Sequence, residues 1–185
     1  MEKIGGAVSE EGISEANINL EIALKLQNLL EQSGATVILT RSTDEAIYDA
    51  NSDGSMRQKK ISDLKNRVKI GNTSSADVFV SIHLNKIPQE QYYGWQTFYK
   101  NNDEQSKQLA ESIQNNLNEA IQKENHRLAK TIENIYIVDN VEIPMTIVEC
   151  GFLSNHEELR DLQTGEYQEK IAWGIYNGIM DWFKT

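Results

Sequence analysis

The segment DVFVSIHLN (77–85) places a single imidazole, that of His83, at the polar end of an apolar run. β-Branched and aromatic residues dominate the run and predict a strand buried on both faces: Val78, Phe79, Val80 and Ile82. Open α/β sheets hold their functional groups at strand ends. A histidine there is also often only a hydrogen-bonded loop residue. This segment alone leaves both interpretations of His83 open.

A second apolar segment of the same design favours a functional role. The run MTIVECGFLSN (145–155) predicts another buried strand, and this one carries Glu149 near its end. An unpaired carboxylate is costly to bury unless a cation holds it or its pKa rises. The presence of Glu149 in this strand is therefore not explained by a contribution to stability. Two strands that each end in a chemically capable side chain predict one shared site.

The segments around these two strands alternate between helix and strand. Apolar residues at helical spacing predict four long helices and one short helical turn: 14–33, 57–72, 103–124, 167–183 and 156–162. Further strands are predicted at 35–40, 94–100 and 135–138, and a polar surface loop at 42–55. This order predicts an α/β fold, a three-layer α/β/α sandwich around a mostly parallel or mixed sheet of at least five strands.

Composition excludes several classes of protein. The chain has 185 residues with 39% hydrophobic content and no internal repeat, so we expect residues 1–185 to form a single domain. A net charge of −10 argues against a nucleic-acid partner, because such binding needs a basic surface. One cysteine permits neither an intrachain disulfide nor a multi-thiolate zinc site. No apolar run is long enough to predict a membrane segment, and the opening residues lack the apolar core of a secretory signal.

Other reactive residues are weaker candidates. Cys150 could act as a nucleophile with His83 or His156 as its base. Strand alternation, however, points Cys150 to the face opposite Glu149, which favours a buried structural cysteine. His126 and His156 lie in polar surroundings, and neither is assigned a role.

A histidine combined with carboxylates, without a thiol cluster, is the ligand set of a catalytic zinc site. The residues offer His83, Glu149 and also Glu15, which lies in the first turn of the first predicted helix. Taken by itself, an acid in that position is typical of a residue that complements the positive end of the helix dipole. The residues alone therefore leave a zinc site short of ligands.

The sequence resembles the zinc-dependent N-acetylmuramoyl-L-alanine amidases of the type 3 class. The resemblance rests on eight segments in the family's order: GGAV (5–8), SEANINLEIALKL (14–26), VILTR (37–41), DLKNRVKIGN (63–72), ADVFVSIHLN (76–85), TFYK (97–100), IVECGFLSN (147–155) and YQEKIAWGIYNGI (167–179). The segments MRQKKISDLKNRVKIGN (56–72) and SIHLNKIP (81–88) are most similar to the spore-former subgroup that acts on cortex peptidoglycan. In that subgroup, removal of the stem peptide precedes formation of the muramic lactam needed for germination.

The resemblance implies a role for each candidate. Glu15 and His83 become ligands of one zinc ion, and Glu149 becomes the catalytic carboxylate that accepts a proton from the attacking water. The implied substrate is peptidoglycan, cleaved between N-acetylmuramic acid and L-alanine. The implied location is the cell envelope or the forespore intermembrane space, and an accessory protein is a further candidate partner.

The sequence departs from the family at its start. Family members open with a strand that ends in a Gly-His-Gly-Gly turn, whose histidine is the remaining zinc ligand. That turn does not occur ahead of GGAV (5–8), so we expect this chain to lack the family's first strand and one ligand. Two alternatives stay open on this ground, a catalytically silent peptidoglycan-binding or regulatory relative and an inactive truncated chain. A cysteine hydrolase that uses Cys150 is a weaker one.

Overall fold

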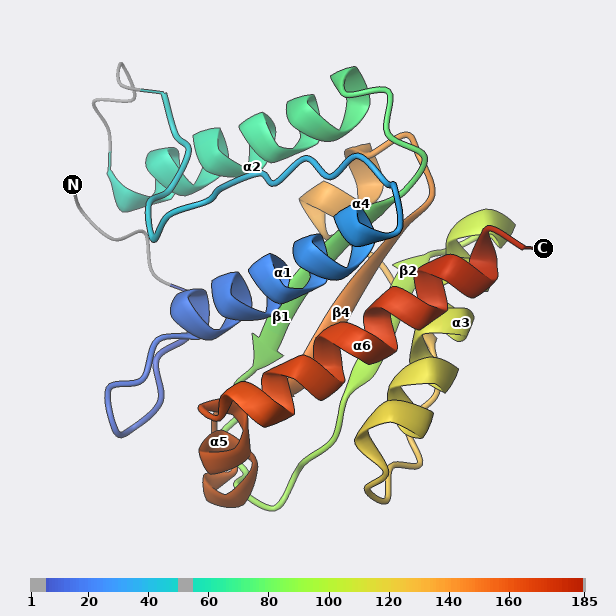
Figure 1. The fold of residues 1–185 in the computed structure, drawn as a ribbon. Helices are drawn as coiled ribbons and strands as arrows, with labels where there is room; N and C mark the ends of the chain where they lie inside the picture. Colours follow the sequence, from blue (N-terminus) through green and yellow to red (C-terminus); the bar gives the residue numbers. More distant parts are fainter. Residues whose placement is uncertain (1–5, 50–54, 185) are drawn as a thin grey trace.

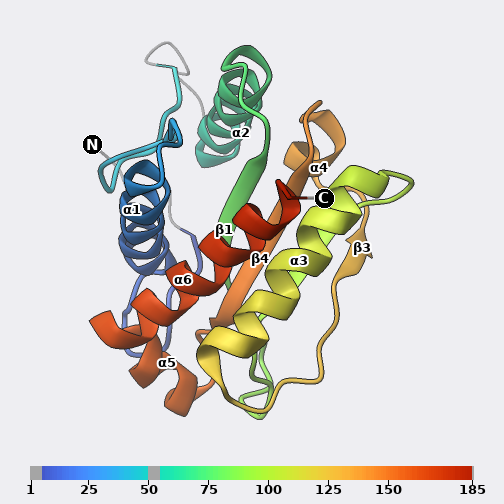
Figure 2. The same ribbon diagram turned by 45° about the vertical axis from the view of Figure 1, so that its right-hand side comes forward.

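The chain folds around a mixed sheet with the strand order β1-β4-β2-β3, of which Figure 1 labels β1, β4 and β2 and Figure 2 labels β3. The computed structural model describes residues 6–49 and 55–184. The strands are β1 (Phe79–Asn85), β2 (Gln96–Lys100), β3 (Lys130–Ile132) and β4 (Met145–Phe152). β4 pairs in parallel with β1 and antiparallel with β2, and β2 pairs in parallel with β3. The central strand of the site is therefore β4, with β1 on one side and β2 on the other.

Helices cover both faces of this sheet, as the alternation of helix and strand predicts (Figure 2). They are α1 (Glu15–Gln32), α2 (Met56–Thr73), α3 (Glu104–Ile121), α4 (Tyr136–Asn140), α5 (His156–Leu162) and α6 (Gly165–Trp182). The long helices α1, α3 and α6 pack on one face of the sheet, and α2 and α4 pack on the other. The three-layer arrangement is thus confirmed.

Alternation along β4 separates the two halves of the core. Val148 and Cys150 are buried with the apolar residues of α1, α3 and α6. Met145 and Ile147 are buried with Val68 of α2 and with the apolar residues of α4. Glu149 follows the odd-numbered residues and so points to the α2 side of the sheet. It is the one residue of β4 that is not fully buried.

Two of the predicted strands are wrong. Residues 35–40 belong to no strand, and Ile38 is 50% exposed. A strand needs a neighbour for its backbone ladder, and no described residue pairs with this segment. Residues 135–138 mostly lie in α4, because a short apolar run fits a buried helical turn as well as a strand. The described residues therefore form four strands, and the predicted fifth is not among them.

Three smaller differences concern strand boundaries, burial and the polar loop. β3 is absent from the prediction, since its residues KTI lie in a polar stretch. β1 is half-buried rather than buried on both faces, because in the part of the chain that is described it forms an edge of the sheet. Residues 42–49 have no regular structure, as predicted for the surface loop, and 50–54 lie outside the described residues.

Candidate active site

The Glu15 carboxylate is held in place by the protein. Oε1 accepts hydrogen bonds from Asn19 Nδ2 at 3.0 Å and from the Leu84 backbone at 3.3 Å. Oε2 accepts the backbone N–H of Ala7 at 2.7 Å. A Cβ atom on Gly6 would lie 2.6 Å from Oε2, so a larger residue at this position would displace the carboxylate. With 7% of its surface exposed, Glu15 has an orientation set by these contacts rather than by solvent.

The His83 ring lies directly against this carboxylate. Its Nδ1 is 2.9 Å from Glu15 Oε1, and its Nε2 is 3.0 Å from Ser81 Oγ. The His83 side chain is 46% exposed, so the ring combines a fixed position with access from solvent. The structure thus brings together a helix N-terminus and a strand end that are 68 residues apart in sequence.

Glu149 lies next to His83 in the register of the sheet. His83 is its partner on β1, and Gln96 is its partner on β2, so the three residues form a row across three strands. Glu149 Oε2 is buried and has no hydrogen-bond partner among the described residues. A buried, unpartnered carboxylate oxygen is rare in native proteins and calls for an explanation such as catalysis or a missing ligand.

The three ionisable groups have displaced pKa values. Burial raises the pKa of Glu149 to about 7, because the attraction of His83 only partly offsets it. Burial also works to raise the pKa of Glu15, but the hydrogen bond and charge of His83, with two backbone N–H groups, lower it to about 2. For His83, burial opposes the charged ring, yet Glu15 and Glu149 outweigh it and raise the pKa. One acid is therefore held ionised while its neighbour takes up protons near neutral pH.

We expect the unpartnered carboxylate to make the metal-free protein less stable at high pH. Because the folded pKa of Glu149 lies above the unfolded value, the folded state binds more protons between about pH 4.5 and 7, and stability falls across that window. Glu149→Gln removes this fall. In urea titrations with chelator, the variant should exceed the wild type by about 1–3 kcal/mol at pH 8 and by much less at pH 4.5. A gain of the same size in Glu142→Gln, an exposed acid, would contradict this.

The remaining reactive residues lie away from this row. Cys150 is fully buried on the opposite face of β4, and burial raises the pKa of its thiol, as expected for a structural cysteine. His126 is exposed beside Glu124, at 2.8 Å. His156 lies 3.4 Å from Glu11 at the edge of a shallow surface pocket. Neither histidine makes a hydrogen bond or ion pair with Glu15, His83 or Glu149.

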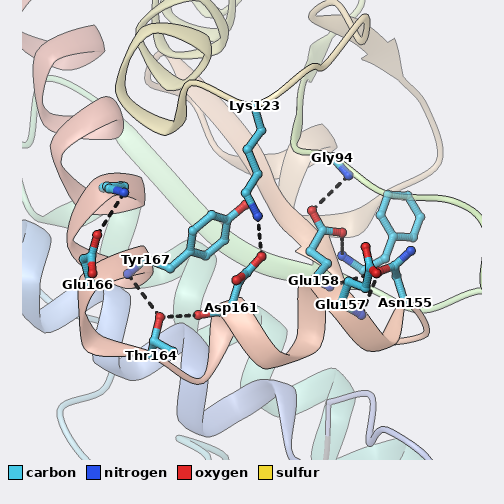
Figure 3. A network of polar contacts seen from close by, with 11 residues as sticks. Gly94, Lys123, Asn155, Glu157, Glu158, Asp161, Thr164, Glu166 and Tyr167 are labelled. Carbon is cyan, nitrogen blue, oxygen red and sulfur yellow. Dashed lines mark hydrogen bonds and ion pairs between the residues drawn. The ribbon is translucent and has the colours of Figure 1, made fainter.

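One residue that matters for the site was missed by sequence reasoning. Glu158 of α5 is 7% exposed, and its carboxylate accepts the Gly94 N–H at 2.9 Å and the Phe152 N–H at 2.7 Å (Figure 3). Gly94 leads into β2, and Phe152 ends β4. Glu158 therefore ties together the two strands that carry Gln96 and Glu149. The available signal was Asn155, a helix-capping residue three positions ahead of an acid.

Glu158→Gln should destabilise the protein by about 1–3 kcal/mol, because the amide N–H₂ faces a backbone N–H and leaves that buried donor unpaired. Chemical unfolding at neutral pH measures the loss. The matched control is Glu157→Gln, the exposed neighbour on the same helical turn, which should stay close to the wild type. Equal stability of the two variants would show that the hydrogen bonds of Glu158 to Gly94 and Phe152 contribute nothing to the free energy of unfolding.

Comparison with known proteins assigns this arrangement to a family. Residues 2–181 match the N-acetylmuramoyl-L-alanine amidase family Amidase_3. The chain belongs to this family. The germination-specific N-acetylmuramoyl-L-alanine amidase of Bacillus subtilis is 38% identical over 179 residues, which cover 97% of this chain and 74% of the relative. The amidase LytC of the same organism is 29% identical, over 97% of this chain and 33% of the relative.

Solved structures of amidases have the same fold. The CwlD amidase from Clostridioides difficile, solved in complex with the GerS lipoprotein, is 45% identical with a TM-score of 0.94, over 97% of this chain and 92% of that one. A Clostridium difficile 630 amidase is 29% identical with a TM-score of 0.84, over 98% and 90% of the two chains. The resemblance inferred from sequence motifs is therefore confirmed at the level of the family.

Two further observations bear on how an amidase of this kind works. Among residues 6–49 and 55–184, no three His, Cys, Asp or Glu side chains are grouped so as to hold a metal ion. Glu15 and His83 form a pair of suitable donors without a third in that part of the chain. None of the described helices has the length and apolar character needed to cross a membrane.

Proposed function

We propose that the protein hydrolyses the amide bond between N-acetylmuramic acid and L-alanine in peptidoglycan. The observation that carries this proposal is the position of Glu149. Its Oε2 is buried without a hydrogen-bond partner among the described residues, and Glu149 pairs with His83 across β4 and β1. His83 in turn contacts Glu15. The chain belongs to a family of amidases, and the unpartnered Glu149 carboxylate lies beside two residues that can bind a metal, Glu15 and His83. This combination supports catalysis rather than binding alone.

We propose that Glu15 and His83 are ligands of a zinc ion. The donors fit, because a carboxylate oxygen and an imidazole nitrogen are ordinary zinc ligands, and here they lie 2.9 Å apart. A catalytic site usually takes three protein ligands, and the described residues supply two. When bound, zinc supplies a Lewis acid that polarises the carbonyl and makes water more acidic.

Glu149 acts as the general base in this proposal. Its carboxylate accepts the proton of the water that adds to the lactyl carbonyl, and returns it to the amine of L-alanine as the C–N bond breaks. The products are a muramic acid carboxylate and a free stem peptide. A pKa of about 7 suits this role, since a base that titrates near the working pH can both take and give the proton. The hydrogen bonds that Glu15 accepts from Asn19 and from the Ala7 and Leu84 backbones hold its carboxylate in place beside His83.

The relatives support a narrower setting for the reaction. Similarity to the germination-specific amidase of Bacillus subtilis and to CwlD supports a role in the spore cortex, in muramic-lactam formation and germination. The substrate would then be met outside the cytoplasm, in the cell envelope or the forespore intermembrane space. The CwlD–GerS complex supports an accessory lipoprotein as a partner of this chain as well.

The test is release of stem peptide from purified peptidoglycan by the zinc-loaded protein. We expect new L-alanine amino groups, detected by N-terminal labelling, and disaccharides without peptide, detected by mass. Chelation should abolish release, and added zinc should restore it. Binding to peptidoglycan without release, also in the presence of a candidate accessory lipoprotein, would favour the catalytically silent relative. Loss of activity on thiol alkylation would favour the cysteine hydrolase.

A further inference from the structure

Arg127 is held beside the Glu149 row by three contacts. Its Nε donates to the Tyr93 carbonyl at 3.0 Å, and its Nη1 donates to Gln96 Oε1 at 3.2 Å. Its guanidinium lies over the Phe152 ring, 4.8 Å from the centroid. These contacts come from the chain before β2, from β2 itself and from the end of β4. The guanidinium therefore has a fixed place at the strand ends, where the proposed substrate would lie.

The guanidinium keeps N–H donors that the described residues do not use. An arginine has five N–H donors, and the two hydrogen bonds above go to neutral acceptors. No carboxylate in residues 6–49 and 55–184 makes a salt bridge with Arg127. Burial raises the pKa of Glu158 and the charge of Arg127 acts to lower it, but both oxygens of that carboxylate already accept backbone N–H groups. A half-buried, pre-ordered arginine with N–H donors left over is suited to an external anion.

The spacing from Glu149 selects the kind of anion. Gln96 is the partner of Glu149 across β4 and β2, and neighbouring strands lie about 4.8 Å apart. Gln96 Oε1 accepts the Arg127 Nη1 at 3.2 Å, so the side chain of Gln96 alone separates the guanidinium from the row that contains Glu149. An extended peptide advances about 3.5 Å per residue. A carboxylate on the residue after L-alanine lies within about 7 Å of the scissile amide, which is a suitable reach for a guanidinium held one side chain away from the Glu149 row.

We infer that Arg127 binds a free carboxylate of the stem peptide, at the residue that follows L-alanine, and so determines specificity. The inference rests on the proposed amidase function, because that function supplies the peptide. Gln96 and Tyr93 position the guanidinium by accepting hydrogen bonds from two of its N–H groups. The remaining N–H groups donate to the carboxylate oxygens. A peptide in which that carboxyl group is amidated loses the charge-assisted hydrogen bonds and binds less well.

The experiment compares the binding of two ligands to a variant that should not cleave them. Zinc-loaded Glu149→Gln protein is titrated with N-acetylmuramoyl-L-alanyl-D-isoglutamate and with its isoglutamine counterpart. We expect the carboxylate ligand to bind about tenfold or more tightly, the usual scale of a hydrogen bond to a charged group. Adding Arg127→Gln should bring the ratio of the two dissociation constants to about one. Adding Arg160→Gln, on the exposed side of α5, is the matched control and should keep the ratio.

Each other outcome has a distinct meaning. If Arg127→Gln weakens both ligands equally, the arginine only anchors its loop, and the inference is overturned while the amidase function stands. If the Glu149→Gln protein binds neither ligand, the proposed substrate fails and the inference falls with it. Arg127→Lys guards against a folding defect, because it keeps the charge and should give an intermediate ratio. A ratio of one in the lysine variant, with its melting temperature unchanged, would also overturn the inference.

Discussion

Glu149→Gln should lower amide hydrolysis by about two to four orders of magnitude, the usual scale of a lost general base. The substitution keeps the shape of the side chain and removes only the proton acceptor. Because Glu149 makes no hydrogen bond through Oε2, the variant loses no structural contact at that atom. The fold and zinc affinity should therefore survive, and the effect should fall on kcat more than on KM.

Steady-state kinetics on a soluble muropeptide measure this effect, together with zinc content and thermal melting. Glu142→Gln, an exposed acid just before β4, serves as the control for the charge change and should retain wild-type rates. Wild-type activity in Glu149→Gln would make the glutamate structural and leave the reaction without a base. A loss of zinc in the variant would instead place Glu149 among the ligands.

His83→Ala should lower zinc affinity by at least about 100-fold and reduce hydrolysis to background, because it removes one of the two proposed zinc ligands, Glu15 and His83. The stabilisation that zinc confers on the folded state should fall with the affinity. A chelator competition assay gives the affinity, and melting with and without zinc gives the stabilisation. Both readouts are independent of the reaction.

The chain offers matched controls for this experiment. His126→Ala and His156→Ala remove histidines that are exposed and contact neither Glu15 nor Glu149. Both should bind zinc and hydrolyse the substrate as the wild type does. Zinc binding in His83→Ala as tight as in the wild type would show that His83 is not a ligand. Loss of zinc in either control would show that the ligand set includes a residue outside the proposed pair.

Much of the site follows from local sequence patterns. His83 and Glu149 stand out because each is a reactive side chain placed in or at the end of an apolar strand, and the parallel pairing of β1 and β4 sets them side by side. Cys150 is buried on the other face, as the period of two along a strand requires. The five helices predicted from their apolar spacing are present, because that period depends only on the chain itself.

Features that depend on distant partners were decided only by the tertiary structure. The residues next to Glu15 in sequence indicate only an acid that complements the helix dipole. Its contact with His83 exists because α1 packs beside β1. Residues 35–40 have the composition of a strand but no partner for a ladder among the described residues, whereas the short apolar run at 135–138 is helical. Sheet pairing joins groups far apart in sequence, so composition alone cannot settle it.

The same reason explains why the sequence does not indicate Glu158 or Arg127 as part of the site. Glu158 lies in a predicted helical turn behind the capping residue Asn155, and Arg127 lies in a polar stretch, but neither setting reveals a distant partner. Glu158 gains its role because its carboxylate reaches the ends of β2 and β4, and Arg127 because its guanidinium reaches Gln96 and the Phe152 ring. The sequence alone determined which strands carry the proposed chemistry and which family the chain resembles. Only the packing of strands and loops decided which charged groups surround that chemistry, since those contacts join segments that are far apart in the chain.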